Sequence, residues 1–132
     1  MTTYPLTTGI TLLIVLLMFG VAANVGYARE RYGVKAPAMT GNEYFERAYR
    51  IQSNTMEWAM IFLPTLWIFA CYVGDLHALI AGLVGLAGRI LYAVSYQRDP
   101  KTRSTGFMLG MLPFGVMGLW GGFVVLRSII GF

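Results

Sequence analysis

Long apolar runs separated by short polar connections organise the chain. They predict four helices, over residues 5–28, 43–73, 76–97 and 104–130. An apolar helix needs about 20 residues to cross the hydrocarbon core of a bilayer, and each predicted helix is at least that long. The pattern therefore predicts an all-α fold, an integral membrane four-helix bundle that forms a single domain over residues 1–132.

Glycines on two of these helices indicate where the bundle packs closely. Gly82, Gly85 and Gly88 give the third helix small surfaces, and Gly118 and Gly122 have the GxxxG spacing in the fourth. Small residues allow the backbones of membrane helices to approach one another. We expect these glycines to lie at helix contacts.

The composition supports a location in a membrane. Hydrophobic residues make up 57% of the chain and charged residues 12%, whereas a soluble domain carries about 25% charged residues. A length of 132 residues holds four crossings with short connections. No room is left for a large soluble domain.

Basic residues concentrate in two of the three connections. They are Arg29, Arg31 and Lys35 between the first two helices, and Arg98, Lys101 and Arg103 between the last two. By the positive-inside rule, connections 28–42 and 97–104 are cytoplasmic and both termini lie on the opposite side. A bacterial inner membrane and an endoplasmic reticulum membrane both fit this arrangement. Topology accounts for the net charge of +4, so we expect no nucleic-acid partner.

The second predicted helix carries charged and amide side chains into its apolar run. At about 100° per residue, Arg50, Asn54 and Glu57 share one face. Arg50 and Glu57 are about 10 Å apart along the axis, which suits the two ends of a small zwitterionic ligand. Charged groups within a bilayer are costly and are often functional. The alternative is a structural ion-pair network with Glu46 and Arg47.

The third predicted helix carries a second polar cluster. Tyr92 and Tyr96 are four residues apart and share a face, with Arg89 three residues before Tyr92. In an antiparallel bundle these groups lie level with the arginines of the second helix and with Arg103. Together the clusters predict an anionic-ligand pocket at this level. The alternative for the two tyrosines is an interfacial aromatic belt.

Motifs for soluble-enzyme chemistry and metal binding do not occur in the sequence. The chain has one histidine, His77, and one cysteine, Cys71, which excludes a cysteine-histidine zinc cluster. It also lacks a glycine-rich phosphate-binding motif. We therefore expect no metal. A small four-helix multidrug exporter would be expected to carry an acidic residue in its first helix, and residues 5–28 contain none.

Several separated motifs together resemble one known family. They are the sequence FERAYRIQSNTME over residues 45–57, Thr65-Leu66-Trp67, Gly88-Arg89 with Tyr92, then Tyr96 and Arg103. In their order and spacing, from about residue 28 to residue 110, the chain resembles the membrane-associated proteins in eicosanoid and glutathione metabolism, the MAPEG family. The resemblance implies a homotrimer of four-helix subunits, with glutathione bound between neighbouring subunits at the cytoplasmic side.

The resemblance also implies roles for individual residues. Those implied to bind glutathione are Arg50, Asn54, Glu57, Tyr92 and Tyr96 from one subunit, and Arg29 and Gln52 from the next. Gln52 lies about 200° around the helix from Arg50, so it faces away from that site. Arg103 lies where the family has its thiol-activating arginine and is the implied catalytic residue.

The function implied by the resemblance is a membrane-bound glutathione transferase. Glutathione would be its co-substrate, and its thiolate would attack lipophilic electrophiles that arrive from the bilayer, in detoxification. Reduction of lipid hydroperoxides is an implied side activity. Glu30 stands where leukotriene-forming members have a second arginine, and Trp58 replaces a tyrosine, which favours a broader transferase. The alternative is a non-enzymatic lipid-binding scaffold of the same family, against which Arg103 argues.

Overall fold

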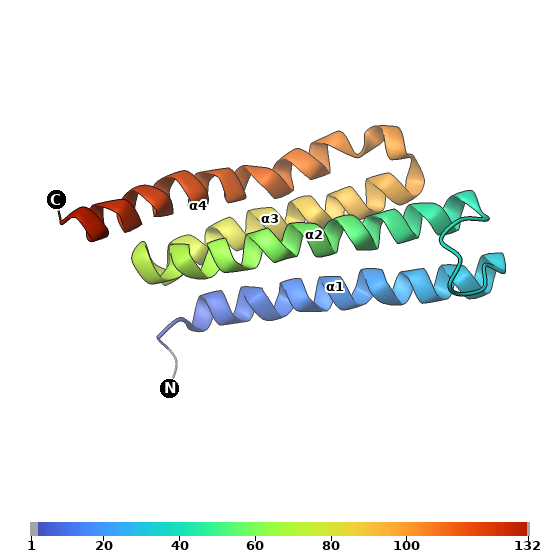
Figure 1. Cartoon of the computed structure of the whole chain (residues 1–132), viewed down its shortest axis with the longest axis horizontal. Coiled ribbons are helices and arrows are strands. Elements are labelled where there is room, and N and C mark those ends of the chain that lie inside the picture. The colour runs from blue at the N-terminus through green and yellow to red at the C-terminus, as the bar shows by residue number, and fades with distance from the viewer. Residues whose placement is uncertain (1–2, 132) are drawn as a thin grey trace.

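The computed structural model describes residues 3–131 and shows a bundle of long helices (Figure 1). In chain order, the elements are α1 (Pro5–Tyr32), α2 (Glu43–Tyr72), α3 (Asp75–Arg98), the 3₁₀ turn η1 (Pro100–Thr102) and α4 (Ser104–Ile130). Each of the four long helices has the length and apolar composition to cross a membrane. The predicted all-α four-helix membrane bundle is confirmed, and the chain is a multi-pass integral membrane protein.

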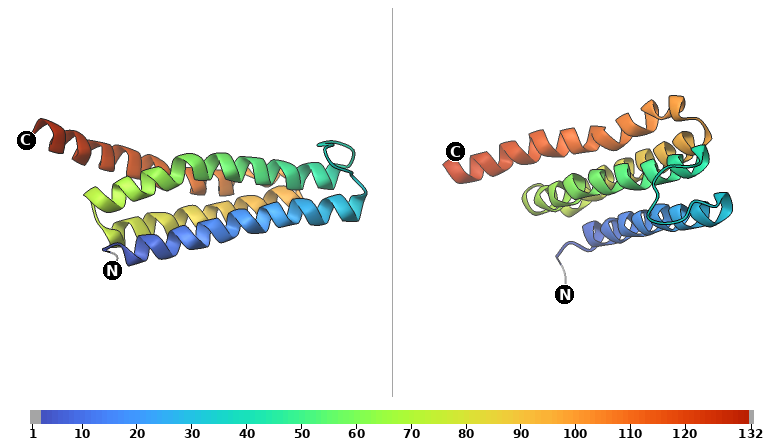
Figure 2. Two further views of the ribbon diagram at one scale, coloured as in Figure 1. Left: turned by 60° about the horizontal axis from the view of Figure 1, so that its bottom comes forward. Right: turned by 45° about the vertical axis from the view of Figure 1, so that its right-hand side comes forward.

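Both basic connections lie at the same end of the bundle. The α1–α2 and α3–α4 connections are found there, and the α2–α3 turn lies at the opposite end with the first and last described residues (Figures 1 and 2). We call the end that carries the α1–α2 and α3–α4 connections the basic end. The helix α1 continues one turn beyond the predicted end at residue 28, because Gly33 ends it in a left-handed conformation with φ 68°. Arg29 and Arg31 therefore lie in its last turn, where cations are favoured.

Polar contacts between helices satisfy two helix ends. The carboxylate of Asp75, the first residue of α3, accepts hydrogen bonds from the backbone N–H groups of Leu6 (3.1 Å) and Thr7 (2.8 Å) at the start of α1. At the basic end, Arg47 of α2 donates to the carbonyls of Gln97 and Arg98, both at 3.1 Å, at the end of α3. Because helix ends leave backbone groups unpaired, these contacts also hold the neighbouring helices in register.

The larger of two apolar core clusters occupies the half of the bundle nearer the α2–α3 turn. Ile10 and Ile14 of α1 pack there with Phe62 and Phe69 of α2 and with Met117 of α4. The exterior is also apolar, and the large exposed side chains include Leu16, Met60 and Leu119. A soluble monomer rarely presents so much apolar surface, but a bilayer matches it.

Glycines bring α3 and α4 into backbone contact near the basic end. A Cβ atom added to Gly106 would lie 2.3 Å from the backbone nitrogen of Tyr92, and one added to Gly88 would lie 2.4 Å from the backbone nitrogen of Gly110. The expected contacts of Gly82, Gly85 and Gly88 are confirmed. Within the described chain the expected contact of the GxxxG pair is not made: a Cβ atom added to Gly118 or Gly122 would meet nothing within 4 Å, whereas Gly106 and Gly110 approach α3 closely.

The second half of α4 diverges from the rest of the bundle (Figure 2). Buried residues of α4 recur up to Gly121, and among the described residues none beyond it is buried. The tight glycine contact and the divergence therefore divide α4 into a packed half at the basic end and an apolar half that projects away from α2 and α3.

The glycine contact generates the first prediction. Gly106→Ala is expected to lower the free energy of unfolding by about 1–3 kcal/mol or more, because the new methyl group overlaps the α3 backbone, which cannot rotate away. Thermal unfolding in detergent measures the effect. Gly118→Ala is the matched control, since the same methyl group there enters open space. Equal unfolding midpoints for the two variants would contradict the close approach.

Candidate functional site

A polar hollow opens between α2, α3 and the start of α4 near the basic end. It has a volume of about 380 Å³ and is lined by Arg50, Ser53, Asn54, Glu57, Tyr92, Tyr96 and Arg103. The structure thus brings the predicted face of α2 opposite the predicted tyrosines of α3 and beside Arg103. Ser53 is an addition that the sequence reasoning missed, although at about 60° from Arg50 it lies on the same helical face.

Arg103 is held in place by the short connection before it. Its guanidinium donates to the carbonyl of Pro100 at 2.7 Å and lies 5.9 Å from the centre of the Tyr96 ring. The hydroxyl of Thr102 donates to the carbonyls of Asp99 (2.8 Å) and Ser95 (3.2 Å), which ties η1 back to α3. The guanidinium of Arg103 therefore lines the hollow from a turn that hydrogen bonds fix to the end of α3.

Arg50 and Glu57 have no hydrogen-bond or ion-pair partner among the described residues. Within the described part of the chain, the ion-pair network considered as an alternative does not form: Arg47 pairs with Glu43, and the carboxylate of Glu46 accepts from the backbone N–H of Gly41 at 3.4 Å. Both unpaired charges line the hollow. A guanidinium and a carboxylate on one face are thus available to a ligand.

Arg89 lies beside Tyr92, as its spacing suggested, but it is behind the hollow and does not line it. Its side chain is fully buried. It donates to Asn54 Oδ1 at 2.8 Å and to Thr55 Oγ1 at 3.0 Å, and its guanidinium lies 4.1 Å from the centre of the Tyr92 ring. Burial of Arg89 follows from the glycine contact, because its side-chain stem packs where Gly110 has no side chain.

Arg29 and Gln52 lie away from the hollow of their own chain. Arg29 donates to the carbonyl of Ala38 at 2.7 Å, and its guanidinium lies 4.7 Å from the centre of the Phe45 ring. Gln52 lines a largely apolar groove formed with α1, which includes Val15 and Met18. Within one chain these two residues do not reach the other predicted ligand-binding residues, and their role at a neighbour's site stays a prediction.

Trp58 faces the interior of the bundle. Its indole N–H donates to the carbonyl of Gly110 at 3.0 Å, and its ring stacks on Phe62 with 4.4 Å between ring centres. Trp58 therefore joins α2 to α4 and contributes no group to the hollow.

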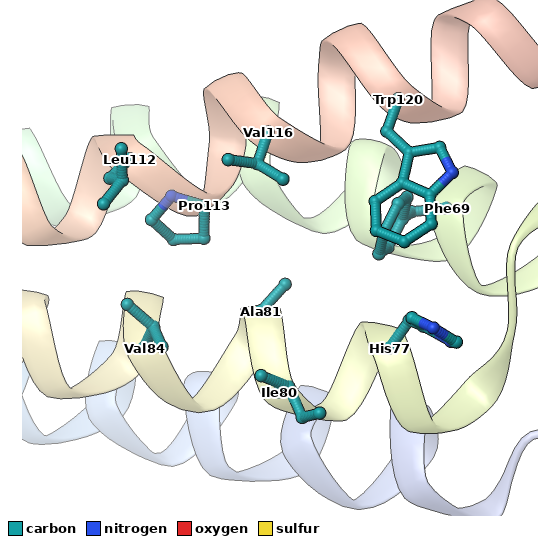
Figure 3. Close-up of a pocket in the computed structure, with 9 residues that line it drawn as sticks. All are labelled: Phe69, His77, Ile80, Ala81, Val84, Leu112, Pro113, Val116 and Trp120. Atoms are coloured by element: carbon teal, nitrogen blue, oxygen red, sulfur yellow. The ribbon is translucent and has the colours of Figure 1, made fainter.

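A second hollow lies between α3 and α4 toward the other end, where α4 diverges (Figure 3). Its volume is about 240 Å³, and its lining is Phe69, His77, Ile80, Ala81, Val84, Leu112, Pro113, Val116 and Trp120. His77 is the one titratable group there, and its ring meets the edge of Trp120 at 5.3 Å. Residues 3–131 also contain no group of three or more side chains suited to a metal ion. Of these two hollows, the first is the one in which several charged and polar side chains face the same space.

Comparisons with known proteins show which family this chain resembles. A family model described as the MAPEG family matches residues 7–123. An uncharacterized protein of Synechocystis sp. is 50% identical over 103 residues, which cover 78% of this chain and 75% of that protein. Human microsomal glutathione S-transferase 2 is 38% identical over 109 residues, 83% of this chain and 74% of that protein. Leukotriene C4 synthase of Cavia porcellus is 39% identical over 94 residues, 71% of this chain and 63% of that protein.

Proposed function

The chain belongs to the MAPEG family, and on that premise we propose that it is a membrane-bound glutathione transferase whose polar hollow binds glutathione and activates its thiol. The observation that carries the proposal is the convergence of the unpaired charges Arg50 and Glu57 with Arg103 in one hollow. The similarity to microsomal glutathione S-transferase 2 and to leukotriene C4 synthase supports the choice of glutathione.

The groups around the hollow match the chemistry of glutathione. The tripeptide carries an ammonium group, two carboxylates and a thiol. Glu57 would bind the ammonium and Arg50 a carboxylate, through charge-assisted hydrogen bonds. The two side chains start about 10 Å apart along α2, so each reaches a different end of the ligand. Asn54, Tyr92 and Tyr96 add polar contacts between them.

In this proposal the protein acts as a homotrimer. Arg29 and Gln52 of a neighbouring subunit complete the binding site, which accounts for their distance from the hollow of their own chain. Gln52 faces the α1–α2 groove, the side of the subunit on which a neighbour would pack. The basic end is cytoplasmic in this arrangement, in agreement with the positive-inside rule, and the membrane is a bacterial inner membrane or an endoplasmic reticulum membrane.

Arg103 is the proposed catalytic residue. The thiolate is the nucleophilic form of a thiol, and a nearby guanidinium lowers the pKa of the glutathione thiol because it stabilises the anion. Arginine stays protonated when partly desolvated. The anchor to the carbonyl of Pro100 restricts the guanidinium to the region beside Tyr96.

The thiolate then attacks an electrophilic carbon, and a carbon–sulfur bond replaces the bond to the leaving group. Lipophilic electrophiles would reach the hollow from the bilayer along the apolar exterior of the helices, and positioning beside the thiolate supplies much of the rate. With a lipid hydroperoxide, two glutathione molecules would give the alcohol, water and glutathione disulfide. Conjugation of foreign and endogenous electrophiles corresponds to a role in detoxification.

The direct test is a conjugation assay of the purified protein in detergent with glutathione and 1-chloro-2,4-dinitrobenzene. We expect thioether formation, followed by absorbance, that saturates with glutathione concentration. Arg103→Ala is expected to reduce turnover at least tenfold, since the thiolate loses its cation. Absence of turnover in the wild-type protein, together with measurable lipid binding, would favour the non-enzymatic scaffold.

The role of Arg103 is tested separately by the ultraviolet absorption band of the thiolate. Bound glutathione is expected to show this band in the wild-type protein and to lose it in Arg103→Ala, while calorimetry still detects binding. Lys101→Gln is the matched control, because it removes an exposed cation from the same connection outside the hollow. An undiminished band in Arg103→Ala would contradict the assignment.

The role of Glu57 is tested by affinity. Glu57→Gln is expected to weaken glutathione binding about tenfold or more, because a charge-assisted hydrogen bond to the ligand ammonium becomes a neutral one. Titration calorimetry measures the dissociation constant. Glu46→Gln makes the same change on α2 outside the hollow and is expected to bind as the wild-type protein does. Equal affinities for the two variants would show that Glu57 does not bind the ammonium.

A further inference from the structure

Arg89 is the largest fully buried side chain of the described residues, and no carboxylate compensates its charge there. Two neutral oxygen atoms accept from one of its terminal nitrogens, Asn54 Oδ1 at 2.8 Å and Thr55 Oγ1 at 3.0 Å. Its guanidinium also lies over the Tyr92 ring, an attractive arrangement for a desolvated cation. A buried unpaired charge is costly, so its retention beside the hollow calls for an explanation in terms of what it contacts.

The contact with Asn54 determines which end of the amide faces the hollow. A guanidinium has donors and no acceptor, so it can approach only the carbonyl oxygen of the amide. Asn54 also lines the hollow, and its amide nitrogen has no partner among the described residues. The amide N–H donors are therefore left available to a group bound in the hollow. Without Arg89 the amide would be free to turn by about 180° and offer its oxygen instead.

We propose that Arg89 is a positioning residue, which orients the Asn54 amide so that the hollow presents an N–H donor and selects a ligand group that accepts a hydrogen bond. The inference rests on the proposed function, in which that group is a carbonyl or carboxylate oxygen of glutathione. Arg89 acts through Asn54 and does not touch the ligand. Because Arg89 is buried behind the residues that line the hollow, its guanidinium does not bind the ligand in place of Asn54.

If Arg89 only stabilised the fold, changes at Asn54 that keep the fold stable would leave ligand affinity unchanged. A positioning role predicts that affinity falls while stability is kept. Asn54→Asp separates the two, because it places an oxygen on both sides of the side chain. The inner oxygen supplies the carboxylate that the buried guanidinium lacks, so the thermal unfolding midpoint is expected to stay the same or to rise. The outer oxygen replaces the donor, so the affinity for S-hexylglutathione is expected to fall at least tenfold by calorimetry. Unchanged affinity in Asn54→Asp would overturn the proposal.

A double-mutant cycle tests whether Arg89 acts on the ligand through Asn54. Arg89→Met and Asn54→Ala are each expected to weaken S-hexylglutathione binding about tenfold, and the double variant is expected to bind no more weakly than Asn54→Ala alone, since coupled residues are not additive. At saturating glutathione, Arg89→Met is expected to keep the thiolate band, because Arg103 is unaltered. Additive losses, or loss of the band, would overturn the positioning role.

Phe69→Leu is the control for general destabilisation, because Phe69 is buried in the apolar core far from the basic end. It is expected to lower the unfolding midpoint and leave the affinity unchanged. If Arg89→Met does not fold, Asn54→Asp decides the question, since that variant retains the guanidinium. If the wild-type protein binds neither glutathione nor S-hexylglutathione, the proposed function fails and this inference fails with it. Wild-type binding with additive losses rejects the inference alone.

Discussion

Several polar groups of this bundle find partners on a neighbouring helix, because the surrounding hydrocarbon offers none. Asp75 binds the first N–H groups of α1, Arg47 binds the last carbonyls of α3, and Arg89 joins α3 to α2. Each of these contacts spans two helices. Satisfaction of a buried or terminal polar group therefore also sets the relative placement of the helices, and with it the position of the polar hollow.

The close approach of α3 and α4 has two consequences along the same pair of helices. Around Gly88 and Gly106 the backbones touch, which brings Arg103 beside Tyr96 and completes the polar hollow. Beyond Pro113 the helices separate, and the space between them becomes an apolar hollow (Figure 3). The polar hollow thus lies where glycines bring α3 and α4 together, and the apolar hollow lies where the two helices separate.

Helical periodicity correctly predicted which residues of α2 share the face that lines the polar hollow, and the packing between helices was harder to predict. Arg50, Asn54 and Glu57 line one hollow, and Gln52 lies elsewhere, as the angle per residue requires. The same reasoning placed Arg89 beside Tyr92, as the structure has it, but did not predict that its side chain is fully buried behind the hollow. Likewise, two GxxxG pairs exist in α4, and within the described chain the earlier pair, Gly106 and Gly110, makes the close approach to α3.

The sequence by itself determined the four membrane spans, the basic end, the polar face of α2 and the family resemblance. These properties depend on the order of residues along one helix, where the rotation per residue is constant. Only the tertiary structure decided that Arg50 and Glu57 have no partner among residues 3–131, that Arg47 caps α3 and that Arg89 binds Asn54. Those outcomes depend on the rotation and separation of neighbouring helices, which are set by packing between residues that are distant in the chain.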